Sequence, residues 1–388
     1  MKIMHCCLAA FYIDNYGYQE NILPKLHKIQ GHDVSIVAST ENYLEDKTLG
    51  YSEAKSYINE HGIPVTRLSY VGWLPAKIAR KLRLYKGLAS SLKSFKPDVI
   101  FLHDVQFLDV TKIIEYVKQN PATKVYADGH TDFINSARNW VSKNILHKVV
   151  YRWCAKRLEP YVEKFFGVTP LRADFFAEVY GIAKSKIDVL VMGYDDSESD
   201  SREPIKLRKE TRSKFNINDT DFLIVTGGKI DERKKIHLLI EALIELNLPK
   251  TKLLVFGTPT PEMDEKIQKL CKHPSIVYAG WSSQSEICDY LISSDLAFFP
   301  GTHSVIWEQT VGLGIPAVFK KWQGMTHIDV GGNCILLDKA DKDEIKRQIL
   351  SLVASESKLE IMASIARTKG KLNFSYSEIA KKAIGLKV

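Results

Sequence analysis

Charged residues follow two apolar runs of this sequence at the point where each run ends. Gly227 and Gly228 close the run at 222–226, and Lys229 and Lys234 come next, ahead of an amphipathic helical pattern. Glycine lets a backbone approach a phosphate closely, and lysine cations offset the charge that builds on a leaving diphosphate. This setting favours a diphosphate site over the alternative, a solvated loop that merely carries charge.

A second candidate lies in residues 293–319, where an apolar run ends at Pro300. A turn at 301–304 leads into a short helical pattern that carries Glu308. N–H groups at the start of a helix can hold phosphate oxygens, and a carboxylate one turn in can accept two hydrogen bonds from a ribose diol. On spacing alone, an ordinary surface acid explains Glu308 equally well.

A D-x-D motif lies at 219–221. It precedes an expected strand instead of following it, so it should lie at the end of the sheet away from the two stretches above. A Mg²⁺ or Mn²⁺ site built on this motif is therefore not expected. We predict that no metal or other cofactor is required, because Lys229, Lys234 and helix N-termini neutralise the charge instead.

The elements that must position these residues alternate between β-rich apolar runs and helical patterns. Continuous apolar strands alternating with helices indicate parallel sheets covered on both faces. We predict an α/β protein with two doubly wound sheets, whose ligands bind beyond the carboxyl ends of the strands. The expected strands are 3–13, 34–38, 99–102, 125–127 and 190–192 in the first half and 222–226, 252–256, 276–278, 296–299 and 317–319 in the second, with helices at 18–30 and 236–246.

Length and composition fit two soluble domains. At 388 residues the chain exceeds the usual size of one core, and the polar segment 195–221 marks the expected connection. The formal charge of +8 suits an anionic ligand or surface without saying which one. None of the six cysteines forms a C-x-x-C pair, which argues against a zinc site or disulfide framework and favours the cytoplasm.

Two segments raise the question of a membrane. Residues 3–13 favour a buried strand over a signal peptide, because His5 interrupts the apolar run and no cleavage site follows. No run approaches the ~18 apolar residues that span a bilayer, so any membrane contact should be peripheral. Residues 73–96 carry seven basic and no acidic residues with apolar residues at helical spacing. That segment suits anionic lipid on the inner face of the plasma membrane, or an ordinary domain-face helix.

Several of these stretches together resemble one family. Residues 308–318 (EQTVGLGIPAV) resemble the E-A-x-A-x-G-x-P-V-V segment of retaining GT-B glycosyltransferases, family GT4. Gly228-Lys229 with Lys234 is similar to the G-R…K-G diphosphate clamp of that family. Further matches keep the family's order: 16–20 with 31–34 for the opening G-G-x-E…G-H-E-V, 256–259 for the G-x-G-P turn, 278–281 for the F-x-G segment near the base, and 373–380 for the terminal F-S-W-E-x-I-A helix. Each motif is weak alone, but the ordered set spans nearly the whole chain.

The resemblance implies a GT-B fold, in which two Rossmann-like domains face a cleft and a C-terminal helix crosses back. It divides the chain into an acceptor-side domain (1–194), a nucleotide-sugar-binding domain (195–371) and the C-terminal helix (372–388). His130 matches the family's histidine that faces the donor sugar, where it could polarise a sugar hydroxyl or orient the acceptor. A capping or core histidine is the alternative.

The resemblance also implies three groups of site residues. The catalytic group is His130, Lys229 and Lys234. The donor-binding group is Gly17, Gly228, Gly257, Thr258, Trp281, His303, Ser304 and Glu308. The acceptor-side group is Tyr16, His103, Asp128 and Asp132.

Two positions depart from the family pattern. Glu308 matches the second glutamate of the usual E-x7-E, but Pro300 stands at the first and cannot act as an acid. His303 or the backbone beside Ser304 is the candidate to replace it. Lys229 stands where arginine is commoner, which keeps the charge but loses the bidentate fork, and Lys235 stands where glycine is expected.

The leading interpretation is a retaining glycosyltransferase that moves a sugar from a nucleoside-diphosphate sugar to a glycan, lipid-linked or other hydroxyl acceptor, in cell-surface polysaccharide or glycoconjugate synthesis. An inverting GT-B transferase and a GT-B-fold sugar epimerase are alternatives. A nucleotide- or nucleic-acid-binding module is a third, but no stacked aromatic platform supports it. A dehydrogenase is disfavoured because no G-x-G-x-x-G follows the first strand.

Overall fold

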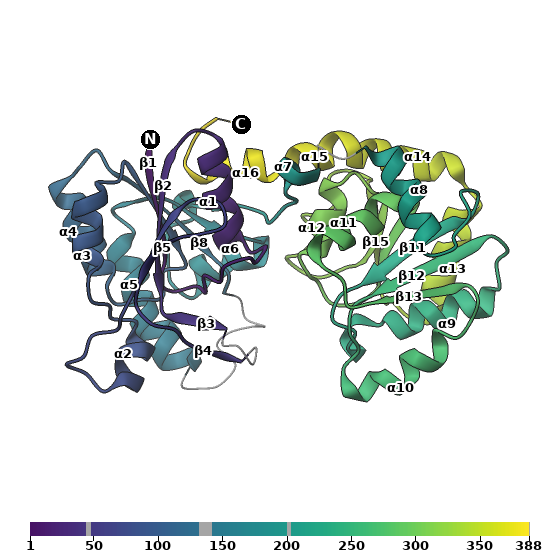
Figure 1. The fold of residues 1–388 in the computed structure, drawn as a ribbon, viewed down its shortest axis with the longest axis horizontal. Coiled ribbons are helices and arrows are strands. Elements are labelled where there is room, and N and C mark those ends of the chain that lie inside the picture. The colour runs from purple at the N-terminus through teal and green to yellow at the C-terminus, as the bar shows by residue number, and fades with distance from the viewer. Residues whose placement is uncertain (44–47, 132–141, 200–202, 388) are drawn as a thin grey trace. The chain divides into compact units, whose positions relative to one another are not determined.

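The computed structural model describes residues 1–43, 48–131, 142–199 and 203–387. Contacts divide the chain into two compact units. The first unit comprises Met1–Val191 with Ile379–Val388, and the second comprises Met192–Glu378. The sequence-based boundaries were 194/195 and 371/372. Figure 1 labels the elements of both units.

The first unit is built on an eight-stranded sheet in the order β10-β9-β8-β7-β1-β2-β6-β5. Neighbouring strands pair in parallel except β5 with β6, and β3 and β4 form a separate antiparallel pair. The strands are β1 (Lys2–Cys7), β2 (Asp33–Ser39), β3 (Glu41–Tyr43), β4 (Leu49–Tyr51), β5 (Ser56–Ile58), β6 (Pro64–Leu68), β7 (Val99–His103), β8 (Lys124–Gly129), β9 (Val162–Gly167) and β10 (Ile187–Val189).

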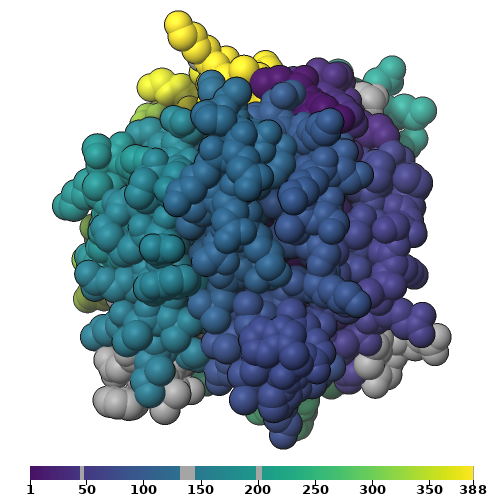
Figure 2. Space-filling model, turned by 90° about the vertical axis from the view of Figure 1, so that its left-hand side faces the viewer, coloured from purple at the N-terminus to yellow at the C-terminus, as the bar shows by residue number. Residues whose placement is uncertain are grey.

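Helices cover both faces of this sheet, because the central strands are apolar on both sides. All residues of β7 and all but one of β1 are buried. Helices α3 and α4 pack together, and Figure 2 looks onto the face of the unit where they lie, in blue. The helices are α1 (Gln19–Ile29), α2 (Ala76–Leu82), α3 (Leu88–Phe95), α4 (Val110–Gln119), the π-helix η1 (Ser142–Tyr151), α5 (Arg152–Leu158), α6 (Pro170–Glu178) and the 3-10 turn η2 (Lys184–Lys186).

The second unit contains a six-stranded sheet, parallel throughout, in the order β13-β12-β11-β14-β15-β16. Its strands are β11 (Phe222–Gly227), β12 (Thr251–Phe256), β13 (Ile276–Gly280), β14 (Leu296–Phe299), β15 (Ala317–Lys320) and β16 (Cys334–Leu337). In this unit the strand order changes direction between β11 and β14, which in a doubly wound sheet is where ligands bind.

Helices flank this second sheet as well. Helix α9 packs beside α13, and α8 beside α11. The helices are α7 (Asp196–Ser199), α8 (Pro204–Lys214), the 3-10 turn η3 (Glu232–Lys234), α9 (Ile236–Leu246), α10 (Pro261–Leu270), α11 (Gln284–Ser293), α12 (Ile306–Gly312), α13 (Lys342–Val353), α14 (Glu356–Ile365), the π-turn η4 (Ala366–Gly370) and α15 (Lys371–Phe374); α16 (Tyr376–Ala383) follows, and its last residues belong to the first unit. The predicted pair of doubly wound α/β sheets is thus confirmed.

Two strand predictions in the first unit were wrong in their bounds. The expected strand at 3–13 ends at Cys7, because the Leu8 carbonyl accepts a hydrogen bond from the Tyr85 hydroxyl at 2.6 Å and no longer belongs to the ladder. The strand expected at 190–192 is instead β10, whose last residue is Val189. Strands β3, β4, β5, β6, β9 and β16 were not predicted. No helix among the described residues combines the length and apolarity that crossing a membrane requires.

Candidate active site

Glycines at the ends of β11 and β12 bring two backbone turns of the second unit into contact. The Gly228 N–H donates to the Phe256 carbonyl at 3.1 Å, and the Ile230 N–H donates to the Thr258 carbonyl at 3.0 Å. Gly257 has φ 108°, and a Cβ there would lie 1.8 Å from the Gly228 carbonyl oxygen. Only glycine fits this position, because any side chain would push the two turns apart.

These turns form one wall of an open pocket of about 560 Å³. The residues that line it include five predicted from the sequence: Gly228, Lys229, Gly257, Thr258 and Trp281. Trp281 is 77% exposed, and Lys229 is also exposed. The pocket therefore combines a flat aromatic face, backbone turns that a ligand can approach closely, and an accessible cation.

Lys234 lies beside the turn that follows β14. Its Nζ donates to the carbonyls of Thr302 and His303, at 2.7 and 3.1 Å. The turn can come this near because Gly301 has no side chain, and a Cβ there would lie 2.3 Å from the Lys234 backbone. Burial lowers the pKa of Lys234 to about 8, although Asp231 partly opposes the shift. An ammonium group has three N–H donors, so one remains for an anion.

Glu308 lies in the first turn of α12 and is fully buried. Its Oε1 accepts hydrogen bonds from His303 Nε2 at 2.7 Å and His327 Nε2 at 2.8 Å. Burial opposes ionisation, but the nearby histidines outweigh it and lower the pKa of Glu308 to about 2. Its second oxygen, Oε2, is buried without a hydrogen-bond partner among the described residues. Glu308 therefore keeps an acceptor that a ligand hydroxyl can satisfy.

His327 is the residue of this group that the sequence reading missed. It lies in the loop after β15, where residues that follow a strand are site candidates, but beyond the family-like segment 308–318. Ser304, by contrast, was predicted, and it lines a small gap together with Lys234 and Thr302. The structure thus brings together Lys234, His303, Ser304 and Glu308 after two neighbouring strands.

The first unit gathers a different set of groups where β7 and β8 end. The two strands pair with His103 opposite Asp128. His103 Nδ1 lies 3.1 Å from Asp128 Oδ2, and His130 Nε2 lies 3.5 Å from the same oxygen. His130 Nε2 is also 3.8 Å from Glu20 Oε1, at the start of α1. His103 and Asp128 have no exposed surface, whereas the His130 side chain is 25% exposed.

Burial and charge act in opposite directions on these groups. Burial would lower the pKa of His130, but the carboxylates of Glu20 and Asp128 outweigh it and raise this pKa to about 9. Burial would likewise disfavour ionised Asp128, but His103 and His130 hold the pKa of Asp128 well below its ordinary value. His130 is consequently a cation at neutral pH, able to donate hydrogen bonds but not to accept a proton.

The remaining predicted residues of the first unit lie around this cluster or outside the described range. Tyr16 is 42% exposed and contacts the rings of Tyr18 and Tyr43, and Gly17 lies between the two tyrosines of this loop before α1. Asp132 falls outside the described residues. His103 and Asp128, which were expected on the acceptor side, have no exposed surface and lie beside the partly exposed His130, so their contact with an acceptor stays a prediction.

Among the residues that the structure describes, two groups of side chains have the composition of a metal site. In each, three potential ligand atoms lie within 4.8 Å of one another: Glu20, His103 and His130 in one unit, and His303, Glu308 and His327 in the other. Both ring nitrogens of His103 already take part in hydrogen bonds, with His5 and Asp128. The Nε2 atoms of His303 and His327 both point at Glu308 Oε1, so each histidine serves that carboxylate directly.

Comparison with known proteins adds three findings. A model of the family Glycosyl transferases group 1 matches residues 208–369. Mannosylfructose-phosphate synthase of Agrobacterium fabrum is 20% identical over 258 residues, which is 61% of this chain and 54% of that protein. The chain thus aligns with about half the length of this curated relative.

Two solved structures share the fold over nearly the whole chain. Alr3699/HepE of Anabaena, solved with UDP and with UDP-glucose, is 14% identical with a TM-score of 0.68, and the match covers 98% of each chain in the UDP complex. A glycosyltransferase of Rickettsia africae is 14% identical with a TM-score of 0.69, over 98% of this chain and 96% of that one.

Proposed function

We propose that this chain, whose residues 208–369 match a model of the family Glycosyl transferases group 1, transfers a sugar from a nucleoside-diphosphate sugar to a hydroxyl acceptor, with retention of the anomeric configuration. The observation that carries the proposal is the arrangement in the second unit. Three features there follow the carboxyl ends of strands. They are the pocket lined by Trp281 and Lys229, the Lys234 ammonium held by two backbone carbonyls, and Glu308, whose Oε2 has no hydrogen-bond partner among the described residues.

Each of these groups has a chemical part in the proposal. The exposed ring of Trp281 is suited to stack on a base, and Glu308 Oε2 to accept a ribose hydroxyl. Lys229 and Lys234 would bind the diphosphate and stabilise the charge that grows as it leaves. Because this cationic pair can replace a divalent ion, we propose a metal-independent reaction.

His130 takes the part of a cationic hydrogen-bond donor in the first unit. With its pKa raised to about 9, it would bind a hydroxyl or an anionic oxygen instead of removing a proton. The acceptor hydroxyl must then lose its proton to another group, and the departing diphosphate is the base that the family resemblance suggests.

The acceptor and the site of action are the finer part of the proposal. The basic segment 73–96 exposes Trp73 (75%) and Ile78 (47%), and η1 and α5 expose Val149 (60%) and Trp153 (43%). Aromatic and aliphatic side chains among lysines and arginines suit an anionic lipid surface, and hence a lipid-linked acceptor in cell-surface glycan synthesis. Sedimentation with anionic but not zwitterionic vesicles, lost in Trp73→Ser, would support this contact. Equal binding to both vesicle types would contradict it.

A thermal-shift panel tests the central claim. UDP, GDP, ADP and their glucose conjugates are added to the full chain, and one nucleotide series should raise the unfolding temperature by mass action. NMR of the product with a hydroxyl acceptor then reports the anomeric configuration, and incubation without acceptor reveals any epimerase activity. Absence of a shift with every nucleotide would contradict the proposal.

A further inference from the structure

A continuous array of buried histidines lies behind His130 in the first unit. His27 Nε2 lies 2.7 Å from the Ala380 carbonyl oxygen, and His27 Nδ1 lies 2.9 Å from His5 Nε2. His5 Nδ1 lies 3.0 Å from His103 Nε2, and His103 Nδ1 lies 3.1 Å from Asp128 Oδ2. The three rings have no exposed surface and come from α1, β1 and β7, so the array connects the C-terminal segment to the carboxylate beside His130.

Counting protons along the array gives a definite result. Its two ends, the Ala380 carbonyl and the Asp128 carboxylate, are both acceptors, and between them run four hydrogen bonds that need one proton each. Three neutral imidazoles supply three protons. If the first bond fixes His27 as the Nε2–H form, the donors must point from His103 toward Ala380, and His103 Nδ1 would then face Asp128 without a proton. One additional proton resolves this conflict.

We propose that the array holds this additional proton on His103, as a buried imidazolium paired with Asp128, and that His5, His27 and His103 are thereby positioning residues for Asp128 and His130. The alternative carrier, a neutral Asp128, is disfavoured because this carboxylate also accepts from the Asp104 N–H at 3.2 Å and Gln19 Nε2 at 3.4 Å. A group surrounded by donors is stabilised as an anion. A buried anion without a countercharge would be costly.

The other rings are poor sites for the charge. Burial, reinforced by the neighbouring histidines, holds the pKa of His5 well below 6.5. Burial likewise lowers the pKa of His27 to about 4, even though the Ala380 carbonyl favours its protonation. The charge therefore resides at the Asp128 end, and His5 and His27 are both neutral Nε2–H tautomers.

Other titratable groups surround the array from each neighbouring element. They are Cys7 of β1, Glu20 of α1, His32 before β2, Asp104 after β7, His130 after β8 and Arg172 of α6. The imidazolium on His103 pairs with Asp128, and His130 lies near both Glu20 and Asp128. The imidazolium on His103 thus limits how strongly Asp128 attracts the proton of His130.

The array also links a proton to the C-terminal segment. Without the Ala380 carbonyl, all donors could reverse, and three neutral rings would satisfy the three remaining bonds to Asp128. Docking of Ile379–Val388 on the first unit is therefore coupled to uptake of one proton.

Long-range ¹H–¹⁵N correlation spectra of the full chain, labelled at histidine, test the proton count directly. At pH 7.5 one ring of the buried array should carry protons on both nitrogens. That signal should disappear in His103→Asn, which retains a donor toward Asp128 without the charge. His130→Gln, a partly exposed site, identifies the second doubly protonated ring should His103→Asn not fold. A spectrum in which all buried rings are singly protonated would overturn the proposal.

The positioning role, which rests on the proposed function, needs its own readout. In His103→Asn the uncompensated charge of Asp128 should shift the titration of His130 upward, and the alkaline limit of transfer should move with it. The matched control His32→Gln removes a ring 6.0 Å from His27 that is outside the array and should leave both unchanged. An unchanged His130 titration in a folded His103→Asn protein would refute the positioning role. The NMR spectra test the proton count independently of the proposed function, so that test remains valid even if no sugar transfer is found.

Discussion

The charged groups at the carboxyl ends of the strands differ in exposure between the two units. In the second unit the loops after β11, β12 and β14 carry glycines, an open pocket and lysines, so positive charge is presented where a ligand can reach it. In the first unit the ends of β7 and β8 and the start of α1 bring together two histidines and two carboxylates, and of these four side chains only His130 is partly exposed.

The comparison shows that the effect of burial on the pKa of a cationic side chain depends on the groups around it. Burial lowers the pKa of Lys234 toward neutrality because its best partners are carbonyl dipoles and not a carboxylate at contact distance. Burial does not neutralise His130, because two carboxylates flank it. One unit thus holds a cation that a diphosphate would stabilise, whereas the other holds a cation that the protein itself already balances.

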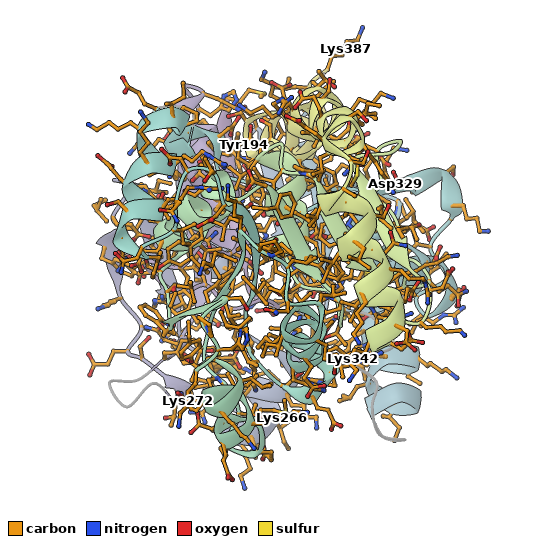
Figure 3. All side chains as sticks on the ribbon, turned by 90° about the vertical axis from the view of Figure 1, so that its right-hand side faces the viewer. Tyr194, Lys266, Lys272, Asp329, Lys342 and Lys387 are labelled. Atoms are coloured by element: carbon orange, nitrogen blue, oxygen red, sulfur yellow. The ribbon has the colours of Figure 1, made fainter. Side chains whose placement is uncertain are left out.

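The largest expected effect is the loss of the anchored cation in the second unit. Lys234→Ala should lower the transfer rate about 10²- to 10³-fold, the usual consequence of removing one donor that stabilises developing charge. Circular dichroism should show an intact fold, because the lysine contacts only backbone carbonyls. Lys272→Ala is the matched control. This exposed lysine, labelled in Figure 3, lies just after α10. It does not line the pocket, so its variant should retain full activity. Normal turnover in Lys234→Ala would rule out the diphosphate role.

The next effect concerns the acceptor on Glu308. Glu308→Gln should weaken binding of a ribonucleotide about tenfold or more, because a hydrogen bond to a charged group contributes about 1.5–3 kcal/mol. The 2′,3′-dideoxynucleotide should bind wild type and variant with equal affinity, since it lacks the hydroxyls in question. Calorimetric titration of both nucleotides into both proteins measures the coupling. An equal loss for the two nucleotides would show that Glu308 acts only through the fold.

The pH dependence of stability should differ between the units. The pKa of His130 is raised from 6.5 to about 9, so its contribution is complete below pH 6.5 and lost as pH rises through 9. The pKa of Glu308 is lowered from 4.5 to about 2, so its contribution is complete above pH 4.5 and lost as pH falls through 2.

Thermal unfolding of the two variants measures this difference. His130→Gln should lower the unfolding temperature near pH 6 by about 2–4 °C for each kcal/mol lost, and the deficit should shrink by pH 9.5. The deficit of Glu308→Gln should instead shrink toward pH 2. Deficits that do not change with pH would mean that neither charge contributes to folding.

The smallest expected effect is that of chelation. If Lys229 and Lys234 balance the diphosphate, then EDTA should leave the transfer rate unchanged, and added Mg²⁺ or Mn²⁺ should alter it less than twofold. A zinc-loaded sample provides the opposite control, because His303, Glu308 and His327 lie close enough to rearrange around an ion. A rate that collapses with EDTA and returns with one divalent metal would contradict metal independence.

Local patterns were sufficient to predict much of the second unit. The strand–glycine–lysine–helix order placed Gly228, Lys229 and Lys234 near one another, because a parallel strand followed by a helix leaves few paths for the chain. The pocket with Gly257, Thr258 and Trp281 followed from ordered motifs. The presence of Lys235 where the family has glycine can also be explained by local structure. This residue has φ 53°, where glycine would be unstrained, and its Nζ donates to the carbonyls of Lys339 and Ala340 at 3.1 Å.

The first unit resisted prediction where polar residues enter the core. Strand β6 was missed because Arg67 interrupts its apolar pattern, yet this side chain is buried and donates to the Ser39 and Tyr12 carbonyls, both at 3.1 Å. Those acceptors lie 28 and 55 residues away in sequence. No window of sequence reveals such compensation, because satisfying a buried guanidinium depends on distant chain segments.

The sequence by itself determined the two parallel α/β sheets and the residue types that follow their strands, since apolar periodicity and turn chemistry are local properties. Only the tertiary structure decided that His5, His27 and His103 form one array from Ala380 to Asp128, and that His327 joins His303 on Glu308. Protonation depends on which donors and acceptors face each other across as many as 353 residues of chain. That pairing exists only once the strands and helices are packed.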